Sequence, residues 1–145
     1  MSGNDAAAVA REWVQKAEND LRNATHTLNM TRECPTDTAC FHAQQCVEKY
    51  IKALLVVAGI DFPRTHRVDE LLALVPDSHR PRLSADEQDR LTEYATVTRY
   101  PGDYDPISRR EARAAVSTAR RVRRDVRKHL PALALERRRS GSGEA

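Results

Sequence analysis

Aromatic residues and glycines are scarce in this sequence of 145 residues, and both shortages restrict its fold. Phe, Trp and Tyr together make up 5%, so alanine, leucine and valine must fill most of the core. Three of the five glycines lie within the first three or the last five residues. The alternation of apolar and polar residues that is typical of strands is also missing. The composition therefore predicts an all-α protein.

Long hydrophobic stretches are absent as well. No apolar run approaches the ~20 residues that a membrane span needs. The N-terminal segment MSGNDAAAVAREW lacks the basic start and the apolar core of a signal peptide. We therefore expect a cytoplasmic protein without a membrane partner.

The three cysteines, Cys34, Cys40 and Cys46, are evenly spaced, as metal ligands can be. At ~100° per residue, however, Cys40 and Cys46 lie roughly 120° apart around one helix, so they cannot share a metal ion. We interpret them as small buried apolar residues. Neither a metal site nor a cofactor is expected.

Charge is distributed unevenly along the chain, although its formal total is only +3. Residues 1–98 hold 11 Lys and Arg against 15 Asp and Glu, whereas residues 99–145 hold 13 against 6. This polarity indicates either an anionic partner for the C-terminal part or a dipolar surface for self-association.

Apolar residues at three- and four-residue steps, together with breakers such as TRECPTD and RYPGDYDP, divide the chain into helices. Capping boxes at Ser84 and at Ser108 mark two helix starts. The expected helices cover Ala6–Met30, a segment from Thr36 or Asp37 to Ala58 that Gly59 ends, the short Arg67–Val75, Ala85–Thr98, and a last helix from Ser108 to Leu130. They predict an up-and-down bundle of four main helices plus one short helix in residues 1–131, with a disordered basic tail over 132–145.

The most apolar stretch, FHAQQCVEKYIKALL from Phe41 to Leu55, carries six polar residues. On a helical wheel one arc is apolar, while the polar residues form two rows on the other arc. The rows contain Gln44, Glu48 and Lys52, and His42, Gln45 and Lys49. This mixed face favours contact with another helix, either within the bundle or across a dimer. The simpler alternative is a Glu48–Lys52 pair, with His42 and the glutamines tying loop backbone to the helix.

The last expected helix combines an apolar arc with an adjacent basic one. The basic arc contains Arg109, Arg110, Arg113, Arg120, Arg121, Arg124, Arg127 and Lys128. Such a stripe could neutralise successive phosphates of RNA or of a nucleotide. A solvated face, or a surface for an acidic protein, is the alternative. No aromatic residues are interleaved for base stacking, so sequence-specific reading of single strands is not expected here.

Three separated motifs resemble HEPN domain proteins of bacteria and archaea. They are FHAQQCVEKYIKALL, then GIDFPRTHRVDELL, then TRYPGDY, and AENDLRNA at 17–24 is similar to the first helix of that family. The resemblance covers about Ala10 to Leu130. It implies a helical bundle that commonly dimerises and is often encoded beside a minimal nucleotidyltransferase, in pairs like toxin–antitoxin systems. Catalytic members of the family are metal-independent endoribonucleases with an Arg-x(4–6)-His signature shared across a dimer cleft.

Two places in the chain bear on that signature. Arg124 and His129 match its letters, as does Arg123 with His129, but five residues on a helix separate Arg124 from His129 by ~140°. At the position expected from the family, Arg99 is followed by Tyr104 and Asp105 without a histidine. We therefore predict a non-catalytic module, with an endoribonuclease that uses Arg124 and His129 as the alternative.

The resemblance and the charge pattern together predict two sets of site residues. Residues expected to bind a nucleotide or RNA are Arg99, Tyr100, Tyr104, Arg113, Arg120, Arg124 and Arg127. Residues expected at an interface, in a homodimer or with a nucleotidyltransferase, are His42, Gln45, Glu48, Lys49, Lys52 and His66.

Overall fold

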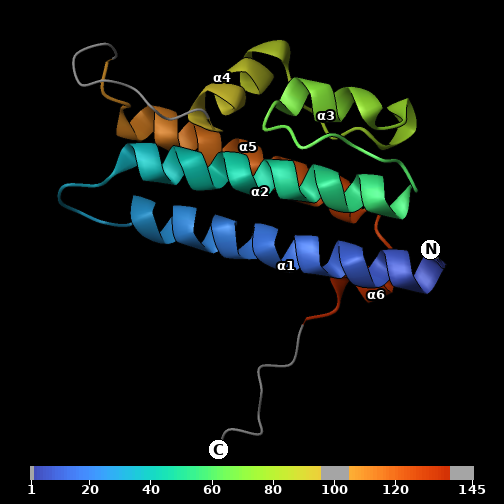
Figure 1. Cartoon of the computed structure of the whole chain (residues 1–145). Coiled ribbons are helices and arrows are strands. Elements are labelled where there is room, and N and C mark those ends of the chain that lie inside the picture. Colours follow the sequence, from blue (N-terminus) through green and yellow to red (C-terminus); the bar gives the residue numbers. More distant parts are fainter. Residues whose placement is uncertain (1, 96–104, 138–145) are drawn as a thin grey trace, which may run out of the picture.

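A computed structural model describes residues 2–95 and 105–137, and every regular element in these two ranges is a helix. The elements are α1 (Gly3–Leu28), α2 (Thr36–Val57), α3 (Val68–Leu74), the 3₁₀ turn η1 (Asp77–His79), α4 (Ala85–Ala95), α5 (Arg109–Arg127) and α6 (Ala132–Leu135). Helices α1 and α2 lie side by side as an antiparallel pair (Figure 1). The predicted all-α bundle is confirmed, and η1 and α6 are additions to it.

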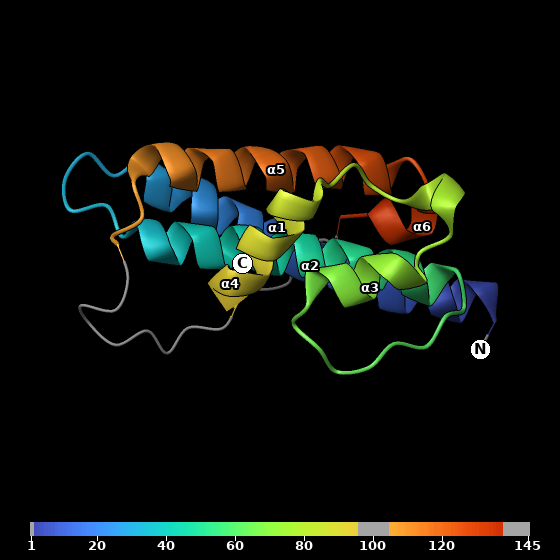
Figure 2. The same ribbon diagram turned by 90° about the horizontal axis from the view of Figure 1, so that it is seen from above.

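Helix α2 is the centre of the bundle. It contacts α1, α3, α4 and α5, and Figure 1, together with the view from above in Figure 2, shows these helices below, above and behind it, with no described helix over the side that faces the viewer of Figure 1. Its predicted apolar arc supplies fully buried residues such as Tyr50 and Ile51. Leu55, which a helical wheel places among the polar residues rather than on the apolar arc, is also fully buried. Because helices pack on several sides of α2, it has very little surface left for water.

Local chemistry explains where the helices begin and end. Helix α1 starts three residues earlier than predicted, because the Ser2 hydroxyl accepts a hydrogen bond from the Asp5 amide and the Asp5 carboxylate accepts one from the Ser2 amide. The capping box predicted at Ser84 is present in the same form, with Glu87. Gly59 follows α2 with φ 71°, a backbone conformation that glycine adopts without steric cost.

Two contacts fasten the start of α5 to the turn between α1 and α2. Arg109 donates hydrogen bonds to the carbonyls of Leu28 (3.0 Å) and Met30 (2.5 Å). Thr36, predicted as a possible cap of α2, instead donates its hydroxyl proton to the Ile107 carbonyl at 2.6 Å. Segments more than 70 residues apart in sequence are therefore joined at one end of the bundle.

The expected tail is ordered in its first part. Residues 132–145 were predicted to be disordered, but Ala132–Leu135 form α6, which packs on α1 and buries Ala134 completely. The basic composition of the following residues concealed a short apolar ALAL segment that covers part of α1. Residues 138–145 lie outside the described ranges.

Cys40 and Cys46 are buried in the core, as predicted, and both are free thiols. Burial raises the pKa of Cys40 to about 12, and burial also raises the pKa of Cys46. These thiols therefore remain protonated and act as small apolar residues. No helix within the described ranges is both long and apolar enough to cross a membrane.

Candidate functional site

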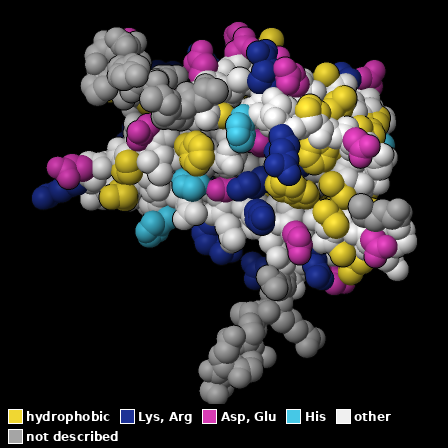
Figure 3. Space-filling view, in the orientation of Figure 1, with side chains coloured by type: hydrophobic (Ala, Val, Ile, Leu, Met, Phe, Trp, Pro, Cys, Tyr) yellow, Lys and Arg dark blue, Asp and Glu magenta, His cyan; other side chains and the backbone are white. Residues whose placement is uncertain are grey.

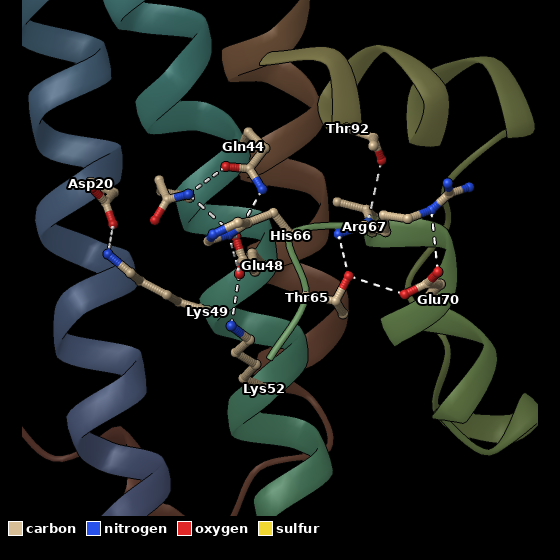
Figure 4. A network of polar contacts seen from close by, with 12 residues as sticks. Asp20, Gln44, Glu48, Lys49, Lys52, Thr65, His66, Arg67, Glu70 and Thr92 are labelled. Atoms are coloured by element: carbon tan, nitrogen blue, oxygen red, sulfur yellow. Dashed lines mark hydrogen bonds and ion pairs between the residues drawn. The ribbon is translucent and has the colours of Figure 1, made fainter. Parts of the chain in front are cut away.

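A buried carboxylate organises the polar residues of α2. Glu48 is only 2% exposed and accepts hydrogen bonds from Gln44 (2.8 Å), Gln45 (3.2 Å) and Lys52 (2.7 Å). The imidazole Nδ1 of His66, from the segment before α3, lies 3.1 Å from Glu48 Oε1 (Figure 4). The i,i+4 pair of Glu48 and Lys52 was predicted, but its depth in the structure was not.

A second buried carboxylate, that of Asp20, joins α1 to α2 through polar contacts. Asp20, on α1 and 7% exposed, lies 2.8 Å from His42 Nδ1 and accepts a hydrogen bond from Lys49 Nζ at 2.5 Å. We call the two groups together the α2 network. It contains Asp20, His42, Gln44, Gln45, Glu48, Lys49, Lys52 and His66.

The α2 network changes the interpretation of the predicted interface residues. His42, Gln45, Glu48, Lys49, Lys52 and His66 do lie together, but each bonds to another residue of the same chain. The mixed face therefore serves first as a contact within the bundle, one of the two alternatives that the sequence left open. Its two carboxylates and two lysines neutralise each other, and the described residues contain no group of three or more His, Cys, Asp or Glu that could hold a metal ion.

Hydrophobic side chains border the α2 network on the same face. Lys52 Nζ lies 5.4 Å from the centre of the Trp13 ring and 5.9 Å from that of Phe62. At the other end of α2, Phe41 is 36% exposed. Figure 3 shows histidine, basic and acidic side chains gathered near the middle of this face, with hydrophobic side chains beside them.

A different surface lies between α1 and α5, where four of the five Arg and Glu side chains are cations. We call it the basic groove, lined by Glu18, Leu21, Arg22, Thr25, His26, Asn29, Arg120, Arg123 and Arg124. Arg22 and Arg124 make no ion pair with any described residue. Within the described ranges Arg120 makes one side-chain hydrogen bond, at 3.1 Å to the Thr25 hydroxyl. Several guanidinium groups therefore face the groove with donors to spare.

One carboxylate of the basic groove, that of Glu18, binds two arginines of α5. Glu18 accepts hydrogen bonds from Arg123 Nε (2.9 Å) and from Arg127 Nη1 (3.1 Å). Arg127 also lies 3.3 Å from the hydroxyl of the buried Tyr50, whose pKa is raised by burial. Glu18 thus fixes two arginines while it neutralises one of them.

The structure divides the predicted basic stripe of α5. Arg120 and Arg124 line the groove, Arg127 lies beside it and bonds to Glu18, and Arg113 is exposed on α5 outside the groove. Arg121, in contrast, pairs with Glu87 of α4, and Arg109 is bound to backbone carbonyls. The groove also contains Arg22 and His26 of α1, which the sequence analysis missed. Their spacing of four residues indicates that they share one face of α1. Nothing in the sequence indicated that this face lies beside α5.

One chain does not bring the literal Arg-His match together. Arg124 faces the basic groove, whereas His129 lies past the end of α5 with its ring 4.3 Å, centre to centre, from the ring of His79 in η1. The other predicted binding residues, Arg99, Tyr100 and Tyr104, lie outside the described residues.

Similarity to known proteins agrees with this fold. The model of the HEPN domain family matches residues 10–129. A curated Methanocaldococcus jannaschii protein named "Putative toxin MJ1304" is 34% identical over 103 residues, which cover 66% of this chain and 65% of that protein. The chain thus spans somewhat less than two thirds of this relative.

Two solved structures are similar in fold and sequence. The crystal structure of TT1696 from Thermus thermophilus has a TM-score of 0.69 and 29% identity, over 83% of this chain and 98% of that one. The crystal structure of ST0689, described as an archaeal HEPN homologue, has a TM-score of 0.66 and 28% identity, over 84% and 98%.

Proposed function

The chain belongs to the HEPN domain family, and from this premise we propose that it is a toxin-like, non-catalytic member that binds RNA or a nucleotide through the basic groove. The name of the archaeal relative supports the toxin-like role. The unpaired guanidinium groups of the groove support the choice of ligand, because phosphates bind arginine forks with charge-assisted hydrogen bonds.

The observation that carries this proposal is the imbalance of charge in the groove. Its described lining holds four arginines and one glutamate, and that glutamate is already bound to Arg123. A groove with an excess of positive charge attracts polyanions. Their binding releases counterions, so affinity should fall as the salt concentration rises.

Fluorescence anisotropy with a labelled single-stranded RNA tests the proposal directly. We expect binding at about 50 mM salt that weakens steeply by about 200 mM, and a shallower salt slope in Arg120→Ala/Arg124→Ala. Arg64→Ala is the matched control, because Arg64 is exposed and lies outside the groove. Affinity that does not depend on salt, or an equal loss in the control, would contradict a role for the groove.

The same samples distinguish binding from cleavage. Intact RNA after prolonged incubation is the expected result, since Arg124 and His129 are not brought together within one chain. Cleavage that disappears in both Arg124→Ala and His129→Ala would replace the non-catalytic proposal with the endoribonuclease one.

We further propose a homodimer joined through the face of α2. The supporting observation is that Phe41, Trp13 and Phe62 place partly exposed rings on both sides of the α2 network. Aromatic anchors around a polar centre are typical of protein interfaces. Sedimentation velocity at micromolar concentration should show a dimer that Phe41→Glu weakens, whereas Leu74→Glu, at a similarly exposed residue of α3, leaves it intact. A wild-type monomer would rule this out.

A nucleotidyltransferase partner completes the proposal. It rests on the family and on the toxin-like relative, and it predicts that expression of the chain alone slows bacterial growth. Co-expression with a nucleotidyltransferase encoded beside it should restore growth and yield a complex on purification. Slow growth that such a protein does not relieve would count against the pairing.

A further inference from the structure

A second hollow adjoins the basic groove toward α6. The two share Glu18, Arg22 and Arg123, and the second is extended by residues of α1 and by the segment that includes Leu135. Its volume is about 810 Å³, within the roughly 300–1,000 Å³ of small-molecule sites. The shared arginines make the hollow and the groove one continuous surface.

The hollow differs from the groove in its chemistry. Val14 and Leu135 give it apolar walls, and the side-chain amides of Gln15 and Asn19 lie among its lining residues. Both of its glutamates are already engaged, since Glu18 binds Arg123 and Glu136 lies 3.8 Å from Arg11. A ligand here would meet apolar surface, neutral hydrogen-bonding groups and the guanidinium group of Arg22, which has no ion pair with a described residue.

Gln15 carries the most informative detail. Its carboxamide nitrogen is buried, yet it has no hydrogen-bond partner within the part of the chain that the structure describes. Buried polar groups of folded proteins are nearly always hydrogen-bonded, so an unpaired donor at the edge of a hollow needs an explanation. Rotation of the Gln15 side chain toward the hollow would let an acceptor atom of a ligand provide one.

We propose that this hollow accepts the base of a nucleotide whose phosphate lies at Arg22 and Arg123. The inference rests on the proposed function and adds a base site to the phosphate site of the groove. Base recognition uses apolar or guanidinium surfaces against the ring and amide groups at the base edge, and the lining of the hollow includes the apolar Val14 and Leu135 and the amides Gln15 and Asn19. The described lining contains no aromatic residue, so the base would pack against Val14, Leu135 and the guanidinium groups.

The ligand could be a free nucleotide or one nucleotide of an RNA strand. Isothermal titration with the four nucleoside monophosphates and with ribose 5-phosphate measures the first source. Anisotropy with an oligonucleotide and with the same strand carrying one abasic residue measures the second. We expect at least fivefold tighter binding with the base in one of these two comparisons, and the comparison that responds identifies the source.

Gln15→Leu is the decisive variant. It keeps the size of the side chain and removes an unpaired amide, so the thermal midpoint should stay equal or rise. The preference for the base should disappear, while affinity for ribose 5-phosphate and for the abasic strand is unchanged. Asn19→Ala should reduce the preference partly, and Asn4→Ala, an exposed asparagine at the start of α1, should not alter it.

The possible outcomes distinguish the base site in the hollow from the proposed phosphate binding in the basic groove. If ordinary and abasic strands bind equally well and no monophosphate exceeds ribose 5-phosphate, the base site is wrong but the groove stands. A preference that survives in Gln15→Leu would also overturn the assignment of the base to this hollow. If neither a strand nor a monophosphate binds at low salt, the phosphate role of the groove and the base site fail together.

Discussion

The α2 network and the basic groove are both rich in charged side chains, but they use their charges in opposite ways. In the network, Asp20 and Glu48 are almost fully buried, and the lysines and histidines around them are all engaged. In the groove, a single carboxylate, Glu18, faces several guanidinium groups, and Arg22 and Arg124 form no ion pair with a described residue.

This difference separates stability from binding. Buried charges that are paired and hydrogen-bonded hold α1, α2 and the segment before α3 together, and removal of one member leaves another uncompensated. Unpaired charges at a surface contribute little to folding and remain available to an anionic ligand. The comparison therefore predicts that variants of the network change stability and variants of the groove change affinity.

The largest effect is expected from Glu48→Ala. It would leave Lys52, Gln44 and His66 without their common acceptor and should lower the free energy of unfolding by about 3–5 kcal/mol. Urea denaturation measures this. Glu70→Ala is the control, because Glu70 pairs with Arg67 at an exposed site and should cost less than about 1 kcal/mol. RNA affinity of the folded protein should be unchanged. A loss of affinity without a loss of stability would contradict the assignment of the α2 network to stability.

Glu18→Gln should act on both properties, because Glu18 is the one paired carboxylate of the groove. Weaker bonds to Arg123 and Arg127 should destabilise the fold by about 1–2 kcal/mol. The same change removes the negative charge of the groove, so RNA should bind more tightly at low salt. Denaturation and anisotropy on one preparation test both signs. A fall in affinity would show that Glu18 matters more for the position of the arginines than for their charge.

Arg22→Ala/Arg124→Ala should change affinity without changing stability. Neither residue has an ion-pair partner among the described residues to lose, so the free energy of unfolding should stay within about 0.5 kcal/mol. The slope of log affinity against log salt should become shallower by about 1 to 2. If Arg22→Ala alone bound RNA as tightly as the wild type while Arg124→Ala bound it more weakly, the RNA contacts would come from α5 and not from α1.

The smallest effect concerns Asp125, which accepts hydrogen bonds from the backbone and side chain of the exposed Arg82. The side-chain bond holds the pKa of Asp125 below its ordinary value. A depressed carboxyl pKa stabilises the fold above about pH 4 and loses that contribution as pH falls further. Asp125→Asn should therefore lower stability at neutral pH by under about 1 kcal/mol and flatten the decline in acid. Urea midpoints at about pH 7 and about pH 3 test this, and identical pH profiles would refute it.

Much of the fold could be predicted from the sequence because its signals are local. The three- and four-residue apolar steps gave the main helices, and Ser84, Ser108 and Gly59 marked ends that the structure retains. The errors arose where contacts between distant segments, rather than the local sequence, determine the structure. The ALAL segment was too short to be read as a helix, and Thr36 turned its hydroxyl to Ile107 rather than to α2.

The candidate site was less predictable, for the same physical reason. A helical wheel ranks residues by polarity, so it placed Gln44 and Glu48 on the polar arc without indicating their depth, whereas hydrogen bonds let both be buried. The wheel also treated the α5 arginines as one stripe. Only the neighbours of α5 show that Arg121 and Arg109 serve the fold while Arg120 and Arg124 face the groove.

The bonds that fasten α5 to the turn between α1 and α2 also have a consequence for synthesis. The ribosome releases α1 and α2 long before Arg109, so the nascent pair waits with the α5-facing side of α2 exposed. The basic groove cannot form until α5 has left the exit tunnel, since most of its arginines belong to that helix. RNA binding through the groove, as proposed above, would therefore require a nearly complete chain. Ribosome-bound chains stalled before α5 emerges should be digested rapidly by protease within α2, while chains extended past the tunnel should resist.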